Sequence, residues 1–322
     1  MAGNNPTSPE NKRPARAIGI AAAALLSVAL FLLLFHRTNA REVLRYLFAA
    51  NPILIAAALA VSLAENIFFG AFKWRSVMIL ADAHMPYKEA LAIYAGSETA
   101  DMFLPFRLGT LGSAAAVSRS RGVPLPAAAA AAVYDRLQNL LALVPPAALF
   151  LLFSGALPAA LAVAAATAAC AAAFAVFAAL GRRGRHGGAL AAKKGGFASL
   201  AEFASKFTFK QHARFFILAS FYQYAELAVF YLILVATGVK APFLLAASGC
   251  AVTAIAGGMP VTISGFGLRE NAVLLFLAGF APKETLVAAG LLYSAVEYIW
   301  PAVAGAPFVP AFLASLRAGE KS

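Results

Sequence analysis

Charged side chains are scarce in this chain. They make up 12% of its 322 residues, whereas hydrophobic residues make up 62%. Soluble domains carry about 25% charged residues, and half that supply cannot cover a surface that faces water. The mean hydropathy of +0.78 points the same way. The composition therefore excludes an ordinary soluble domain and predicts an all-α polytopic membrane protein whose apolar surface faces lipid.

Cysteine and histidine are also rare. The two cysteines, Cys170 and Cys250, lie inside apolar runs without a partner at CxxC spacing. A disulfide framework and a zinc site are therefore not expected. The four histidines are scattered, and no Ser/His/Asp or Cys/His set suggests a catalytic centre. We expect no metal, no cofactor and no catalytic residue of these kinds.

The net charge of +12 first suggests nucleic acid as a partner. The basic residues, however, lie mostly in short loops between apolar runs, which is the pattern that sets the orientation of a membrane protein. We therefore expect no nucleic-acid partner. The best orientation places both termini in the cytoplasm of a bacterial cell, with the protein in the inner membrane.

Long apolar runs predict about six full transmembrane helices, because a span needs about 20 residues. Two further apolar regions, 89–118 and 241–281, are interrupted by proline, glycine and charge, and each predicts a broken re-entrant hairpin. The predicted full spans are 17–35, 50–72, 125–153, 156–180, 214–237 and 284–312.

The domain organisation follows from these spans. We expect a disordered cytoplasmic tail over 1–16, a single membrane domain over 17–312 and a cytoplasmic tail over 313–322. A basic, glycine-rich cytoplasmic loop, 181–213, joins two halves, 17–180 and 214–312. Each half has a full span, a broken hairpin and another full span, and the hairpins enter from opposite faces. This is the pattern of an inverted repeat with a site near the middle of the bilayer.

Three arginines remain at membrane depth once the other basic residues are assigned to loops and interfaces. They are Arg107, Arg136 and Arg269. Ionisable groups at this depth are costly and usually functional. Lys73, in the run Lys73-Trp74-Arg75, is expected instead to anchor the end of a span at the membrane interface.

The first break contains two acids, Glu98 and Asp101, three residues apart on one face of a helix. Pro105 removes a backbone donor, and Gly109 permits a tight return. One interpretation is a capped turn in which Arg107 and Asp101 neutralise each other. The other is a hinge that presents Arg107 to an anionic head group.

The second break is rich in glycine and precedes a helix whose positive end faces the break. Backbone N–H groups here can approach a phosphate or carboxylate closely. The alternative is a tightly packed hairpin with an Arg269–Glu270 pair. The residues of interest are Gly258 and Pro260 as hinges, and Thr262, Ser264, Gly265, Gly267 and Arg269 as ligand-binding residues.

Further acids lie within the spans. Asp135 precedes Arg136 and could meet Arg107 or Arg269. Glu65, Glu226 and Glu297 are single acids, and the last two follow a tyrosine by four residues, Tyr222 and Tyr293. Such a tyrosine could hydrogen-bond the carboxyl group of its own helix. These three carboxyls either hold helices together or form a proton relay.

The motifs Leu104-Pro105-x-Arg107-x-Gly109, Asp135-Arg136 and Pro260 through Gly265-Phe-Gly267-x-Arg269-Glu270 resemble a family. It is the flippase-like integral membrane family, also described as the lysylphosphatidylglycerol synthase transmembrane region. The resemblance covers roughly residues 15–315, without the soluble aminoacyltransferase domain, and so implies translocation and no lysyl transfer. The chain departs from the family in having Thr110 where an acid is common, and Asp135 where Glu is common.

The function expected from these features is translocation of a lipid with an anionic or phosphate-linked head group between leaflets. Arg107, Arg136 and Arg269 would hold the phosphate, while Asp101, Asp135 and Glu270 balance their charge. Membrane lipids are the expected partners, and a homodimer is one candidate assembly. Two alternatives are an intramembrane lipid-modifying transferase and a proton-coupled small-solute transporter that uses Glu65, Glu226 and Glu297.

Overall fold

The structure is a computed structural model of the whole chain. It describes residues 25–30, 32–36, 38–104, 108–153, 200, 203–258 and 265–318. These residues form helices and no sheet, apart from one isolated bridge between Ala278 and Ala281. Three helices are long and apolar enough to cross a membrane: Pro52–Ile79, Phe209–Ala236 and Lys283–Arg317. Shorter apolar helices cover Leu25–His36 and Phe243–Ala254.

The predicted all-helical membrane architecture is therefore confirmed for the described residues. The predicted tail over 1–16, the span over 156–180 and Cys170 lie outside them, as does most of the loop over 181–213. The number of spans and the re-entrant course of the hairpins stay predictions.

The first long helix is one continuous rod built from three segments. Asn51 caps its start, because the side-chain Oδ1 accepts from the backbone N–H groups of Ile53 and Leu54 at 3.0 and 3.3 Å. The rod extends seven residues beyond the predicted end at residue 72. Its segments are α3 (Pro52–Leu63), the π-helical turn η2 (Ala64–Phe69) and α4 (Gly70–Ile79), and the short helix α2 (Ala40–Ala49) precedes it.

The first predicted interruption is confirmed as a break between two helices that pack on each other, α5 (Tyr87–Phe103) and α6 (Leu108–Arg121). Pro105 and Arg107 lie between them, outside the described residues. Helix α7 (Leu125–Phe153) follows with the bounds predicted for its span.

The second half repeats this order. Helix α10 (Phe209–Ala236) starts at a capping box formed by Thr208 and Gln211. Pro260, Thr262 and Ser264 lie in the second break, outside the described residues. The break separates α11 (Phe243–Gly258) from α12 (Leu268–Phe276), and the last rod consists of α13 (Lys283–Ser294), the π-helical turn η6 (Ala295–Ile299), α14 (Trp300–Gly305), η7 (Ala306–Phe308) and α15 (Val309–Arg317).

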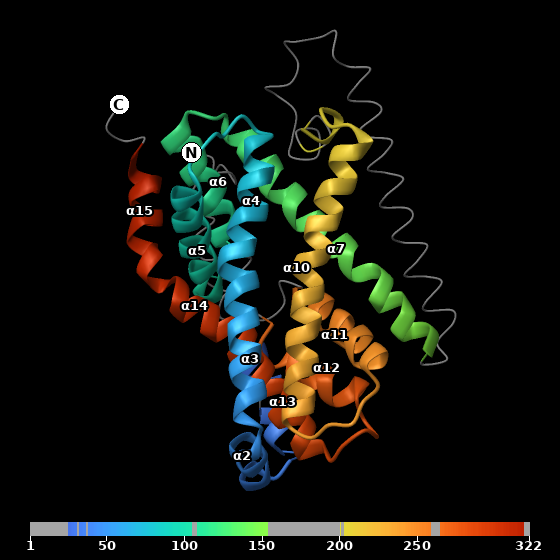
Figure 1. Cartoon of the computed structure of the whole chain (residues 1–322). Helices are drawn as coiled ribbons and strands as arrows, with labels where there is room; N and C mark the ends of the chain where they lie inside the picture. The colour runs from blue at the N-terminus through green and yellow to red at the C-terminus, as the bar shows by residue number, and fades with distance from the viewer. Residues whose placement is uncertain are drawn as a thin grey trace, which may run out of the picture.

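The two halves pack in corresponding ways. Helix α6 packs on α7 in the first half, and α12 packs on α13 in the second. Across the halves, α7 packs against α11, while α14 and α15 pack against α5. The α3–α4 rod runs beside α10, while the α5–α6 and α11–α12 pairs lie towards opposite ends of the molecule (Figure 1).

Small residues allow close approach where α5 meets the last rod. A Cβ atom at Gly96 would lie 2.6 Å from Phe312 Cβ and 2.9 Å from the Phe308 carbonyl oxygen. Thr99 donates to the carbonyl of Ala302 at 3.1 Å in the same interface. Because lipid tails are as apolar as the side chains, packing of this kind and interhelical hydrogen bonds hold membrane helices together.

Candidate functional site

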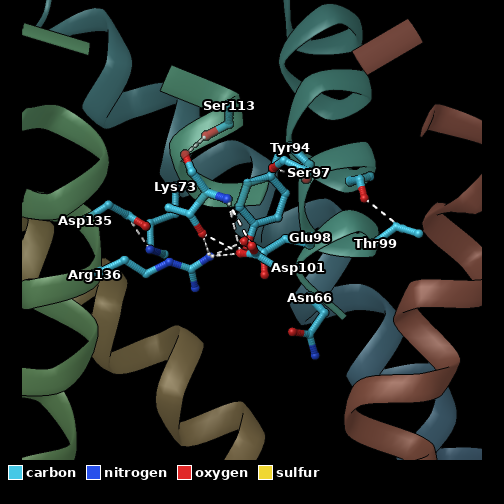
Figure 2. A network of polar contacts seen from close by, with 12 residues as sticks. Asn66, Lys73, Tyr94, Ser97, Glu98, Thr99, Asp101, Ser113, Asp135 and Arg136 are labelled. Carbon is cyan, nitrogen blue, oxygen red and sulfur yellow. Dashed lines mark hydrogen bonds and ion pairs between the residues drawn. The ribbon is translucent and has the colours of Figure 1, made fainter. Parts of the chain in front are cut away.

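A group of charged side chains lies where α4, α5, α6 and α7 meet (Figure 2). Arg136 on α7 forms an ion pair with Glu98 on α5, and its Nη2 also donates to Thr110 Oγ1 at 3.0 Å. Asp101 Oδ2 lies 3.9 Å from the same nitrogen. Their spacing predicted that Glu98 and Asp101 share a helical face, and in the structure both lie near Arg136. We call Lys73, Glu98, Asp101, Thr110, Asp135 and Arg136 the arginine cluster.

Lys73 is the main correction to the sequence analysis. It does not anchor the span at an interface, because its side chain is only 2% exposed and pairs with Asp135, which is 5% exposed. The rod continues to Ile79, so Lys73 lies about 9 Å inside the helix end at a rise of about 1.5 Å per residue. A fourth cation therefore lies at depth, and it is a partner of Asp135 that the sequence analysis did not consider.

Asp101 holds the two helices of the first hairpin together. Its carboxylate accepts from Thr110 N at 3.1 and 3.2 Å and from Thr110 Oγ1 at 2.5 Å. Thr110 is the third residue of α6, so its N–H has no partner within the helix. Asp101 thus caps α6 from α5. Thr110 itself donates to Asp101 and accepts from Arg136.

Gly109 is required by the closeness of these two helices. A Cβ atom there would lie 2.8 Å from both Asp101 N and Asp101 Oδ1, and would also clash with the carbonyl oxygen of Ser97. The predicted tight return at Gly109 therefore serves close packing around Asp101.

The described end of the second break is a glycine turn that starts α12. Gly265 and Gly267 have φ angles of 75° and 82°, which L side chains rarely adopt. Glu270 accepts from Gly267 N at 2.7 Å and from the Ser294 hydroxyl. Glu270 thus caps α12, and among the described residues it forms no ion pair with Arg269. That Glu270 balances the charge of Arg269 stays a prediction.

Arg269 is 1% exposed and packs on aromatic rings. The central carbon of its guanidinium lies 3.5 Å from the ring centroid of Tyr298 and 5.9 Å from that of Tyr293. A cation over a ring face is attracted by the ring quadrupole. The structure therefore places Arg269 apart from the arginine cluster, against tyrosines of the last rod.

The three single acids of the spans come together in a second group. Asn66 donates to Glu297 at 2.6 Å and to Glu65 at 3.4 Å. Glu226 accepts from Tyr293 at 2.6 Å and from Tyr298 at 2.9 Å. We call Glu65, Asn66, Glu226, Glu297 and the tyrosines 222, 293 and 298 the carboxyl cluster.

The expected pairing of each tyrosine with the glutamate four residues later is wrong. Tyr222 donates across helices to Asn66 Oδ1 at 2.7 Å, and Tyr293 donates to Glu226. The π-helical turn η6 begins between Tyr293 and Glu297. The hydroxyl of Tyr293 instead bonds the glutamate of another helix, Glu226 of α10.

Tyr222 joins the two clusters. Its hydroxyl bonds Asn66, while its ring lies 5.2 Å from Lys73 Nζ. A continuous polar path therefore runs from Glu297 through Asn66 and Tyr222 to the Lys73–Asp135 pair. In the described part of the chain Arg136 and Arg269 share no contact, and Arg107 lies outside it.

Residues 19–305 match the family model described as the lysylphosphatidylglycerol synthase transmembrane region. The chain belongs to this family. The resemblance noted in the motifs is thereby confirmed, and the protein is a multi-pass membrane protein of a family associated with lipid handling. No curated protein matches the chain.

Proposed function

We propose that this protein is a lipid translocase that moves an anionic or phosphate-linked head group between leaflets while the lipid tails stay in the bilayer. One observation carries the proposal: the Arg136–Glu98 pair is 23% and 25% exposed, although it lies among membrane helices. The neighbouring Lys73–Asp135 pair is almost fully enclosed. Among the described cations at membrane depth, which are Lys73, Arg136 and Arg269, Arg136 is therefore the one that a ligand can reach.

The chemistry of this pair suits an exchangeable partner. A guanidinium presents a planar set of donors that matches phosphate in a bidentate geometry. In the empty state Glu98 and Asp101 compensate the charge of Arg136, which avoids an unpaired cation at depth. A phosphate would displace Glu98, whose partly exposed carboxylate can turn towards water. Asp101 would stay in place, because Thr110 binds it through two groups.

The corresponding packing of the two halves supports movement by rocking. Helix α7, which carries Arg136, packs on α11 of the second half, and the last rod packs on α5 of the first. An inverted repeat of this kind lets one half move against the other around a fixed site. In this proposal six full spans and two re-entrant hairpins lie in a bacterial inner membrane with both termini in the cytoplasm.

Arg269 would bind the head group in a second position during the movement. The helix dipole favours an anion at the start of α12. Glu270 accepts from Gly267 N there, so a bound head group would replace this carboxylate. Arg107, Thr262 and Ser264 complete the proposed binding residues, with Pro105, Gly109, Gly258 and Pro260 as hinges.

Translocation tests the proposal directly. The full-length protein would be placed in liposomes that contain fluorescent phosphatidylglycerol in both leaflets, and a membrane-impermeant reductant would quench the outer leaflet. Wild-type protein is expected to expose inner-leaflet label. Arg136→Gln should slow this exposure by at least about tenfold, since one charged hydrogen-bonded contact is worth about 1.5–3 kcal/mol.

Arg317→Gln is the matched control, because Arg317 lies in the exposed last turn of α15. It should leave the rate unchanged. Undiminished movement by folded Arg136→Gln protein, or no movement by the wild type with any anionic lipid tested, would refute the proposed function.

A further inference from the structure

Two π-helical turns face each other in this protein, and each carries a buried acid. Glu65 lies in η2 of the first rod, and Glu297 lies in η6 of the last rod. Asn66, also in η2, donates to both carboxyls. Single π-helical turns are rare and occur often at functional sites. The facing pair thus joins a rod of the first half to a rod of the second.

The two carboxyl groups share one donor, because Asn66 Nδ2 lies 2.6 Å from Glu297 Oε1 and 3.4 Å from Glu65 Oε1. Each residue is only 4% exposed. Glu65 Oε2 and Glu297 Oε2 are buried and have no hydrogen-bond partner. Neither residue forms an ion pair with any part of the chain that the structure describes. Two buried oxygens that lack both a donor and a cation therefore point to a small positively charged ligand.

The described surroundings do not supply that charge. Lys73 of α4 is engaged by Asp135 of α7, and Arg269 of α12 lies on the Tyr298 ring. The remaining groups are acids or neutral donors. The titratable groups around the pair are Glu226 and Tyr222 of α10, Tyr293 of α13, Tyr298 of η6, Tyr94 of α5 and Cys250 of α11.

We propose that Glu65 and Glu297 form a proton-binding site in which the two carboxyl groups share one proton. Two carboxylates in contact away from water repel each other, and one proton between them removes that repulsion and supplies the missing donor. A groove of about 250 Å³ has Glu65 in its wall, between Val61 and Ala64 of the first rod and Phe221 of α10. The other residues that line this groove are apolar, so Glu65 is the member of the pair that it reaches.

The role of the proton in transport rests on the proposed translocase function. Loss of the proton to water leaves two like charges on rods of opposite halves, which favours their separation. Glu297 is joined through Asn66 and Tyr222 to Lys73 and Asp135, the residue before Arg136. Proton binding and head-group binding would then be linked through one interface.

Infrared spectroscopy of the full-length protein in liposomes tests the proton site without any transport. The wild type should show a protonated-carboxyl C=O band at neutral pH that disappears as the pH is raised. Glu65→Gln and Glu297→Gln should each remove it. Glu42→Gln, at an exposed acid on α2 paired with Arg45, should leave it unchanged.

The glutamine variants should fold, because glutamine has the shape of a protonated glutamate. If one does not fold, the other reports on the same pair. Absence of the band in the wild type at every pH would refute the proton site. Loss of the band on adding Na⁺ at constant pH would also refute it, by showing that a metal cation occupies the pair.

The liposome assay then tests the coupling. The wild-type rate should change by about tenfold over three pH units, and Glu297→Gln should reduce this to less than about twofold. A band that titrates in a protein that moves no lipid would leave the proton site standing and refute the translocase function. A wild-type rate that does not depend on pH would refute the coupling alone.

Discussion

The arginine cluster and the carboxyl cluster are both polar groups inside membrane helices, but they compensate charge in different ways. In the arginine cluster every acid has a cation or a capped helix end as its partner. In the carboxyl cluster the acids meet only tyrosine, amide and other acid side chains among the described residues. The first cluster suits an anion, whereas the second suits a proton.

A second contrast lies within the arginine cluster. Lys73–Asp135 joins α4 to α7, and Arg136–Glu98 joins α5 to α7. The side chain of Arg136 is nevertheless about ten times as exposed as that of Lys73. A buried pair that loses one member leaves an uncompensated charge, whereas a partly exposed pair can exchange its partner. We therefore assign Lys73–Asp135 to stability and Arg136–Glu98 to ligand exchange.

Removing one member of the buried pair should have the largest effect. Asp135→Asn leaves Lys73 charged and enclosed, and should lower the free energy of unfolding by about 3–5 kcal/mol. Thermal unfolding in detergent would measure this as a large fall in the midpoint. The double variant Lys73→Met with Asp135→Leu should recover most of the loss. An Asp135→Asn protein as stable as the wild type would contradict the assignment.

Gly109→Ala should have the next largest effect. Its Cβ would meet backbone and carboxylate atoms of Asp101 at 2.8 Å, and such overpacking costs about 1–3 kcal/mol. Gly112→Ala is the control, because the nearest atom there is Cζ at the far end of the Phe312 ring. Equal falls in the unfolding midpoint would show that the contact with Asp101 is not special.

Thr110→Val should follow. The change removes the hydroxyl that donates to Asp101 and accepts from Arg136, which should cost about 1–2 kcal/mol. Thr285→Val is the matched control. Thr285 Oγ1 is buried and has no hydrogen-bond partner among the described residues, so losing it should not lower the free energy of unfolding. Unfolding curves of the two variants that coincide would refute the role given to Thr110.

Glu98→Gln should have the smallest effect on stability, below about 1 kcal/mol, because the pair is partly exposed. It should nevertheless strengthen the binding of anionic lipid about fivefold, since Arg136 no longer has a competing carboxylate. Titration of labelled phosphatidylglycerol into the detergent-solubilised protein would measure this change. Weaker binding would mean that Glu98 is part of the ligand site and not its competitor.

Proline, glycine and apolar run length predicted much of this fold. The bounds of α7 follow from the length of its apolar run, and the first break follows from Pro105, which removes a backbone donor, and Gly109, which permits a close approach. Glu98 and Asp101 were placed on one face by helical spacing alone. Features of this kind depend on neighbours in the sequence, so the sequence suffices to predict them.

Lys73 and the tyrosines could not be placed in the same way. Lys73-Trp74-Arg75 has the composition of an interface anchor, and only the continuation of the rod to Ile79 puts Lys73 at depth. An apolar run that continues beyond Lys73 is the sequence signal that could have identified its depth. The partners of Tyr222 and Tyr293 depend on contacts between helices far apart in the sequence, which regular helical spacing does not encode.

Native mass spectrometry of gently extracted protein tests the central claim most directly, namely that Arg136 binds a lipid head group. Wild-type protein should retain an anionic or phosphate-linked lipid, Arg136→Gln should lose it, and Arg317→Gln should keep it. Equal retention by folded wild-type and Arg136→Gln protein would contradict the account.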